Sequence, residues 1–251
     1  MHKNLKTFIS LYLVLISVAS ARIYRPLENL DVLYKKEILG KTPADIKALS
    51  LKEYQDFLDI DVNSYERNPN YNTDSTKPTS INVEQANKTL NAVTSNPVVA
   101  LHMYSKYDPT NAGIGFCFGR AMFVDLYLTI NNLNRGSIKK AFVVGPMTNG
   151  GTTTWGWHVT TIVQAFDGPV EKWLAIDPIM YRVLEVKDWY AEALKMSTNG
   201  KLRMYITDAG KFAQTATRYN EQSINIKFYN SYFTDMMKWF ESNDIGQELG
   251  L

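Results

Sequence analysis

Cys117 is the single cysteine among the 251 residues, and it lies in the stretch GIGFCFGRAM, residues 113–122. Glycines before it allow a sharp turn and leave room beside the sulfur. The residues after it form an apolar series at helical spacings of four and three: Phe118, Met122, Leu126, Ile130 and Leu133. A helix that begins at a cysteine favours the thiolate and offers backbone N–H groups to an oxyanion. The stretch therefore predicts a nucleophilic cysteine, with a small buried hydrophobe as the structural alternative.

His158 and Asp177 are the candidates to complete a catalytic triad. His158 lies in WGWHVTTIVQAF (155–166), and Asp177 ends EKWLAID (171–177), directly before a proline. Both segments have strand character, and Asp-Gly-Pro between them predicts a hairpin turn. Pairing around that turn joins residues whose numbers sum to about 335, so His158 would oppose Asp177. The histidine would then act as base and later as acid, with the aspartate fixing its tautomer.

The three segments together resemble a known family. GFCFGRAM, WGWHVTTIV and WLAIDPIMY are similar to the blocks around the catalytic Cys, His and Asp of bacterial secreted protein-glutaminases, which deamidate glutamine side chains within proteins. The resemblance spans residues 113–180. It implies an α+β fold with a papain-like or transglutaminase-like core, in which the nucleophile begins a helix packed on an antiparallel sheet that carries the histidine and aspartate. It also implies protein substrates with exposed glutamine, and neither a metal nor an organic cofactor.

Four further residues are candidates for the substrate cleft: Gly115, Phe116, Trp155 and Trp157. For the two tryptophans, packing of the strand face is the alternative interpretation. Three other functions remain open at this point. A transglutaminase would pass the acyl group to an amine, a cysteine protease would cleave the backbone, and a non-enzymatic secreted binding protein would bury an inert cysteine.

The N-terminus predicts export. Residues 1–21 combine a basic start, a short apolar core and small residues before the expected cleavage point, which is the pattern of a signal peptide. We therefore expect a secreted or periplasmic protein without stable membrane insertion after cleavage. Residues 22–80 form a helical segment, with helix starts at Thr42 and Ser50, followed by a polar linker over 63–80. The resemblance implies that this part acts as an inhibitory pro-segment of a zymogen, and that 81–251 is the catalytic domain.

The remaining patterns are consistent with a globular α+β domain. Helices are expected at 81–94, 188–197 and 231–242, and a short strand at 141–144. The net charge of +2 comes without a basic run, which argues against a nucleic-acid partner. The histidines have no cluster of metal-ligand residues around them in the sequence, so we expect no zinc site.

Overall fold

The computed structural model describes residues 29–67, 80–108, 115–151, 154–167, 170–211 and 230–251. The expected signal peptide lies outside these ranges, as do residues 68–79 of the expected linker. Among the described residues, no helix is both long enough and apolar enough to cross a membrane.

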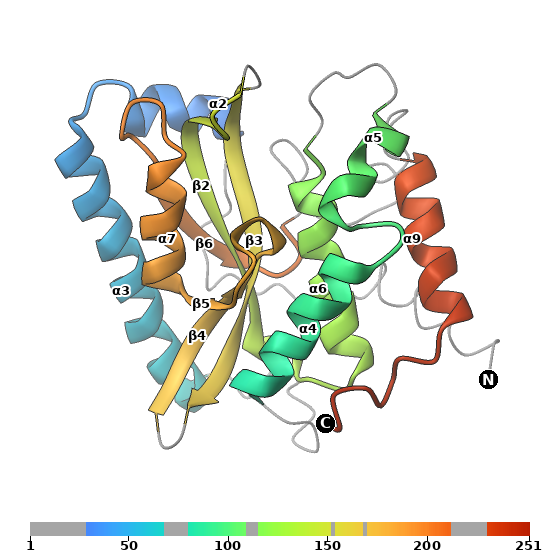
Figure 1. Cartoon of the computed structure of the whole chain (residues 1–251). Helices are drawn as coiled ribbons and strands as arrows, with labels where there is room; N and C mark the ends of the chain where they lie inside the picture. The colour runs from blue at the N-terminus through green and yellow to red at the C-terminus, as the bar shows by residue number, and fades with distance from the viewer. Residues whose placement is uncertain (1–28, 68–79, 109–114, 152–153, 168–169, 212–229) are drawn as a thin grey trace.

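A mostly antiparallel sheet forms the centre of the molecule (Figure 1). Its main strands are β2 (Ile138–Thr148), β3 (Thr154–Asp167), β4 (Val170–Ile176), β5 (Leu184–Glu185) and β6 (Arg203–Asp208), in the order β5-β4-β3-β2-β6. The short β1 (Ile81–Asn82) pairs with β3 in parallel. Helices cover both faces of the sheet, so the α+β fold class is confirmed.

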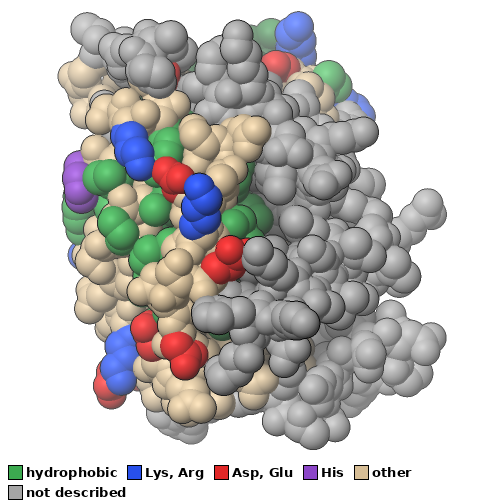
Figure 2. Space-filling view, turned by 90° about the vertical axis from the view of Figure 1, so that its right-hand side faces the viewer, with side chains coloured by type: hydrophobic (Ala, Val, Ile, Leu, Met, Phe, Trp, Pro, Cys, Tyr) green, Lys and Arg blue, Asp and Glu red, His purple; other side chains and the backbone are tan. Residues whose placement is uncertain are grey.

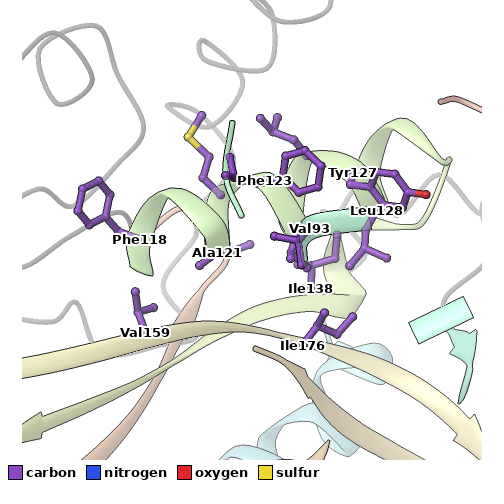
Figure 3. Close-up of a cluster of buried hydrophobic side chains, with 14 of the residues drawn as sticks. Val93, Phe118, Ala121, Phe123, Tyr127, Leu128, Ile138, Val159 and Ile176 are labelled. Atoms are coloured by element: carbon purple, nitrogen blue, oxygen red, sulfur yellow. The ribbon is translucent and has the colours of Figure 1, made fainter. Parts of the chain in front are cut away.

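One face of the sheet carries α4 (Val83–Ser95), α6 (Cys117–Ile130) and α9 (Asn230–Ser242). Nearly all of α6 is buried, because it lies between the sheet and the other two helices. Figure 3 shows the apolar contacts that hold it, in which Phe118 and Ala121 of α6 lie above Val159 of β3. This packing fixes the position of the first turn of α6, where Cys117 lies.

The opposite face carries α3 (Pro43–Arg67) and α7 (Val186–Lys195). The Thr42 cap is confirmed, since its hydroxyl accepts the Asp45 amide while the Asp45 carboxylate accepts the Thr42 amide. The second start expected at Ser50 is wrong, because α3 is continuous through that residue. The Ser50 hydroxyl instead donates to the Ile46 carbonyl and accepts the backbone N–H of Met204 in β6. Its sequence pattern therefore reflects a tertiary contact and not a helix start.

Residues 29–59 pack into the same core as the rest of the chain. Leu30 and Leu33 of α2 (Leu30–Leu33) and Ile38, in the π-helical turn Tyr34–Ile38, are fully buried in the α6 side of the core. Phe57 of α3 is buried on the other side, with its ring 4.8 Å from that of Trp173. The pro-segment remains a prediction, and any cleavage near residues 63–80 would have to leave these contacts in place.

Short helical turns complete the fold. They are η2 (Leu101–Met103), α5 (Tyr104–Tyr107), η3 (Arg135–Ser137) and η4 (Pro178–Met180). Figure 2 looks onto the side of the molecule that carries α5 and α9, where basic and acidic side chains lie close to one another. One such pair joins Lys106 of α5 to Asp235 of α9 at 3.0 Å. The described part of this face therefore has mixed charge.

Candidate active site

Cys117 is a free, half-buried cysteine at the first residue of α6. The residue before it, Phe116, adopts a left-handed conformation (φ 48°, ψ 22°) that turns the chain into the helix. Arg120, which is almost fully buried, donates from Nη2 to the carbonyl of Gly115 at 2.7 Å. The first turn of the helix thus holds the backbone that leads to the thiol, and this preorganises the sulfur.

Gly119, within the same turn, is required by close packing. A Cβ placed there would lie 2.3 Å from Cε1 of Tyr232 in α9. The Tyr232 ring also stacks on that of Phe116, with centroids 4.6 Å apart. The small residue two positions after Cys117 therefore allows α9 to support the nucleophile from behind.

His158 and Asp177 come together at the point where β4 ends. Asp167 pairs with Val170 and Thr161 with Ile176, so paired residue numbers sum to 337, as 161 + 176 shows. The expected sum was therefore wrong by two, and the position opposite Asp177 is that of Thr160. Because side chains alternate with a period of two, this shift keeps Asp177 on the same face as His158, two residues along the strand.

The two side chains form a short hydrogen bond. His158 Nε2 lies 2.6 Å from Asp177 Oδ2, and both residues are almost fully buried. Since Nε2 is engaged by the carboxylate, Nδ1 is the ring nitrogen that remains for the thiol. The Cys117 thiol is close enough to His158 to raise the pKa of its imidazole. The structure thus brings the three predicted catalytic residues together from α6, β3 and the end of β4.

Trp189 of α7 is a further member of this network, which the sequence patterns did not reveal. Its indole Nε1 donates to Asp177 Oδ2 at 2.7 Å, and the Ile179 amide donates to Oδ1 at 3.2 Å. The Trp189 ring also lies 6.3 Å from the His158 ring, centroid to centroid. A buried indole N–H needs an acceptor. A tryptophan shortly after the Ile-Asp-Pro block was therefore the sequence feature that could have indicated this hydrogen bond. Trp189 orients Asp177, which in turn orients His158.

The charges of the pair reinforce each other. Burial acts to lower the pKa of His158, but the Asp177 carboxylate and hydrogen bonds to Asp177 and Cys117 raise it to about 10. Burial likewise acts to raise the pKa of Asp177, and the His158 charge with the donors from His158, Trp189 and Ile179 lowers it. At neutral pH the site therefore holds an imidazolium beside the sulfur, which is the charge arrangement used for nucleophilic thiol chemistry.

The four cleft candidates differ in position. Gly115 is exposed, and a Cβ built there would meet no atom within 4 Å. The expectation for Phe116 is corrected, because its ring is fully buried between Tyr107 and Tyr232. Its left-handed backbone directs the ring into the core. Trp155 and Trp157 are half-buried, and each packs against a different side of the core.

Among the residues that the structure describes, no group of three or more His, Cys, Asp or Glu side chains is placed to hold a metal ion. The thiol, the imidazole and the carboxylate are the groups that the structure brings together at this site. Their arrangement can carry out attack by sulfur with proton transfer through His158.

Comparison with known proteins finds similarity in solved structures only. No family model matches the chain, and no curated protein sequence matches it significantly. The NMR structure of protein-glutaminase from Chryseobacterium proteolyticum is 17% identical, with 59% of this chain and 85% of that chain covered and a TM-score of 0.43. A crystal structure of protein-glutaminase is 17% identical, with 64% and 90% covered and a TM-score of 0.45.

The crystal structure of pro-protein-glutaminase is 16% identical over 64% of this chain and 60% of that longer chain, with a TM-score of 0.44. At these identities the likeness concerns the fold. The solved structures to which this chain is similar thus belong to the family that its three sequence blocks resemble.

Proposed function

We propose that this protein is an exported thiol hydrolase that converts protein-bound glutamine to glutamate and ammonia. One observation carries the proposal: the ring of His158 is hydrogen-bonded to the buried Asp177 carboxylate, and the half-buried Cys117 thiol is close enough to raise the pKa of that ring. An inert core cysteine would not need a buried ion pair beside it, since such pairs are costly to desolvate. The choice of glutamine follows the resemblance of the three sequence blocks, and export follows residues 1–21.

The reaction would proceed in two steps. The Cys117 thiolate attacks the carboxamide carbon, and the oxyanion is positioned near the N-terminal amides of α6. His158 gives a proton to the nitrogen, the C–N bond breaks, ammonia leaves and a thioester remains. Water then attacks the thioester while His158 accepts its proton. The S–C bond breaks, glutamate is released, and the thiolate–imidazolium pair is restored.

Ammonia release from a glutamine-rich protein is the direct test. We expect the wild-type protein to release ammonia with matching conversion of glutamine to glutamate by mass spectrometry, without chain cleavage. Cys117→Ser should reduce this to background, because a hydroxyl is a far weaker nucleophile than a thiolate. His102→Ala is the matched control for His158→Ala, since His102 lies in η2 outside the triad. It should retain activity while His158→Ala loses it.

The same assay separates the alternatives. Addition of a primary amine that is incorporated in place of water would identify a transglutaminase, and new chain termini would identify a protease. Iodoacetamide labelling of Cys117 supplies an independent readout, which should be fast in the wild type and slow in His158→Ala. If Cys117→Ser retained full deamidation, the triad would be refuted.

A further inference from the structure

The two neighbours of β3 differ in length. β2 pairs with β3 residues from Thr154 to Val163, whereas β4 pairs only with residues from Thr161 to Asp167. In Figure 1, β3 continues upward beyond the end of β4. Within the described part of the chain, the edge of β3 that faces β4 therefore has no strand partner over residues 154–160. Pro178 contributes to this end, because it has no N–H to continue the ladder.

Hydrogen-bond alternation identifies the groups that face this edge. Asp167 and Val170 are paired with two residues between them, which makes them a hydrogen-bonded pair. Counting back from Asp167, every second residue of β3 therefore directs its N–H and C=O toward β4. These residues are all odd-numbered. The same alternation directs the main-chain groups of Val159 and Trp157 toward the side where β4 has ended. Of these two residues, Val159 is buried and Trp157 is half-buried.

The open edge lies beside the reactive groups. Trp157 directly precedes His158, whose imidazole has its pKa raised by the nearby Cys117 thiol. A Cβ built at Gly156 would meet no atom within 4 Å, and the same holds for Gly115, two residues before Cys117. The irregularity in β2 between Val144 and Met147 lies opposite Gly156. Trp155 and Trp157 flank this glycine in the sequence and pack against different hydrophobic clusters.

The reach of a glutamine side chain places its backbone at this edge. Only three bonds separate the carboxamide carbon from Cα, so a substrate chain attacked by Cys117 must run close to the sulfur. We propose that the substrate binds as an extended segment that adds to the edge of β3 at Trp157, through main-chain hydrogen bonds. The inference rests on the proposed function and names its substrate class: glutamines in extended, unstructured segments of proteins.

Peptides with altered backbones test this directly. A glutamine peptide would be compared with versions N-methylated at each flanking position in turn, because N-methylation removes one N–H donor and keeps the side chain. We expect kcat/KM for ammonia release to fall about tenfold at alternate positions and to be nearly unchanged between them, as strand pairing has a period of two. A stapled helical peptide with the same sequence should be a poor substrate.

The outcomes separate this inference from the proposed function. If the unmodified peptide is deamidated and N-methylation has no periodic effect, or the helical peptide is equally good, strand addition is overturned while the activity stands. If the wild-type protein releases no ammonia from any peptide or protein, both are wrong.

A protein variant supplies the complementary arm. Gly156→Val adds a side chain beside the proposed edge and should lower kcat/KM for peptides, while iodoacetamide still labels Cys117. Gly40→Val is the matched control, because a Cβ at Gly40 also meets no atom within 4 Å and the residue lies far from β3 in sequence. Equal kinetics for the two variants would overturn the proposal. Faster turnover by Gly156→Val would mean that a segment of the chain itself covers this edge, which would also overturn it.

Discussion

Asp177 and Asp125 are both buried carboxylates beside cationic side chains, and they differ in their hydrogen bonding. Asp177 accepts hydrogen bonds from His158, Trp189 and the Ile179 amide. Asp125 of α6 is fully buried, yet neither of its oxygens has a hydrogen-bond partner among the described residues. Its nearest cations are Lys140 Nζ at 3.8 Å and Arg135 Nη2 at 3.9 Å.

The hydrogen bonds of Asp177 hold its carboxylate in a fixed orientation, whereas the contacts of Asp125 only balance its charge. Three hydrogen bonds fix the direction of the Asp177 carboxylate and favour its ionised form, which the carboxylate partner of a histidine base requires. Asp125 receives attraction without directional bonds, so it holds no group in a fixed orientation. Lys140, which is also fully buried, donates to the Ala209 carbonyl at the end of β6. Burial and proximity of charges alone therefore do not mark the reactive site.

The largest expected contrast is between matched Asn variants of the two aspartates. Asp177→Asn should lower kcat for deamidation on the order of 10³-fold, because the amide can no longer stabilise the imidazolium or select its tautomer. Asp125→Asn should keep its activity, since Asp125 touches none of the reacting groups. Steady-state ammonia release measures both. Comparable losses in the two variants would show that the hydrogen bonds to Asp177 do not distinguish its role from that of Asp125.

A smaller effect is expected from Trp189→Phe, which keeps the aromatic bulk and removes the indole donor to Asp177. Loss of one hydrogen bond to a carboxylate should lower kcat about tenfold. Because that bond helps to lower the pKa of Asp177, its loss raises this pKa. The acid limb of the kcat profile should therefore move to higher pH.

Trp239→Phe is the control for this variant, since Trp239 of α9 packs on Phe123 of α6 and makes no hydrogen bond to Asp177. It should leave the pH profile in place. If Trp189→Phe lowered activity without moving the acid limb, Trp189 would be a packing residue only.

The smallest effect concerns the pH dependence of stability. Burial lowers the pKa of Lys140 to about 7, which the Asp125 charge only partly offsets. The pKa of a lysine in the unfolded chain is about 10.5. Between pH 7 and that value, the unfolded chain binds more protons than the folded protein, so the contribution of Lys140 to stability rises with pH. His158, with its pKa raised to about 10, has the opposite sign. Its contribution is full below about pH 6.5 and is lost as the pH rises through 10.

Lys140→Met should therefore make stability fall more steeply with pH between about 7 and 10 than in the wild type. Urea midpoints measured across this range provide the slope, which can be compared even if the variant is less stable throughout. Lys88→Met, at an exposed position on α4, should follow the wild-type slope. Parallel curves for wild type and Lys140→Met would show that Lys140 does not titrate in this range.

The sequence by itself determined which side chains are candidates for the triad and most of the elements that carry them. The helix expected after Cys117 is α6, and the strands expected at 155–166 and 171–177 are β3 and β4, each within one residue at either end. Helices expected at 188–197 and 231–242 are α7 and α9. Local periodicity encodes such elements, because each side chain's environment follows from its place in the repeat.

Tertiary structure decided the properties that depend on distant segments. The strand expected at 141–144 begins earlier, since β2 starts at Ile138. The sequence did not indicate this start because it contains two lysines, Lys139 and Lys140, which are buried only in the folded protein. The exact hairpin register also depended on the turn, although its period of two preserved the face shared by His158 and Asp177.

The Trp189 bond to Asp177, the burial of Phe116 and the open edge of β3 were likewise absent from any local pattern. The bond requires α7 to lie over the end of β4, and the burial requires a left-handed turn against α9. The open edge exists because β3 extends beyond the last residue of β4 that pairs with it. Residue type and local period set which groups are available, whereas their relative orientation follows from packing between elements far apart in the chain.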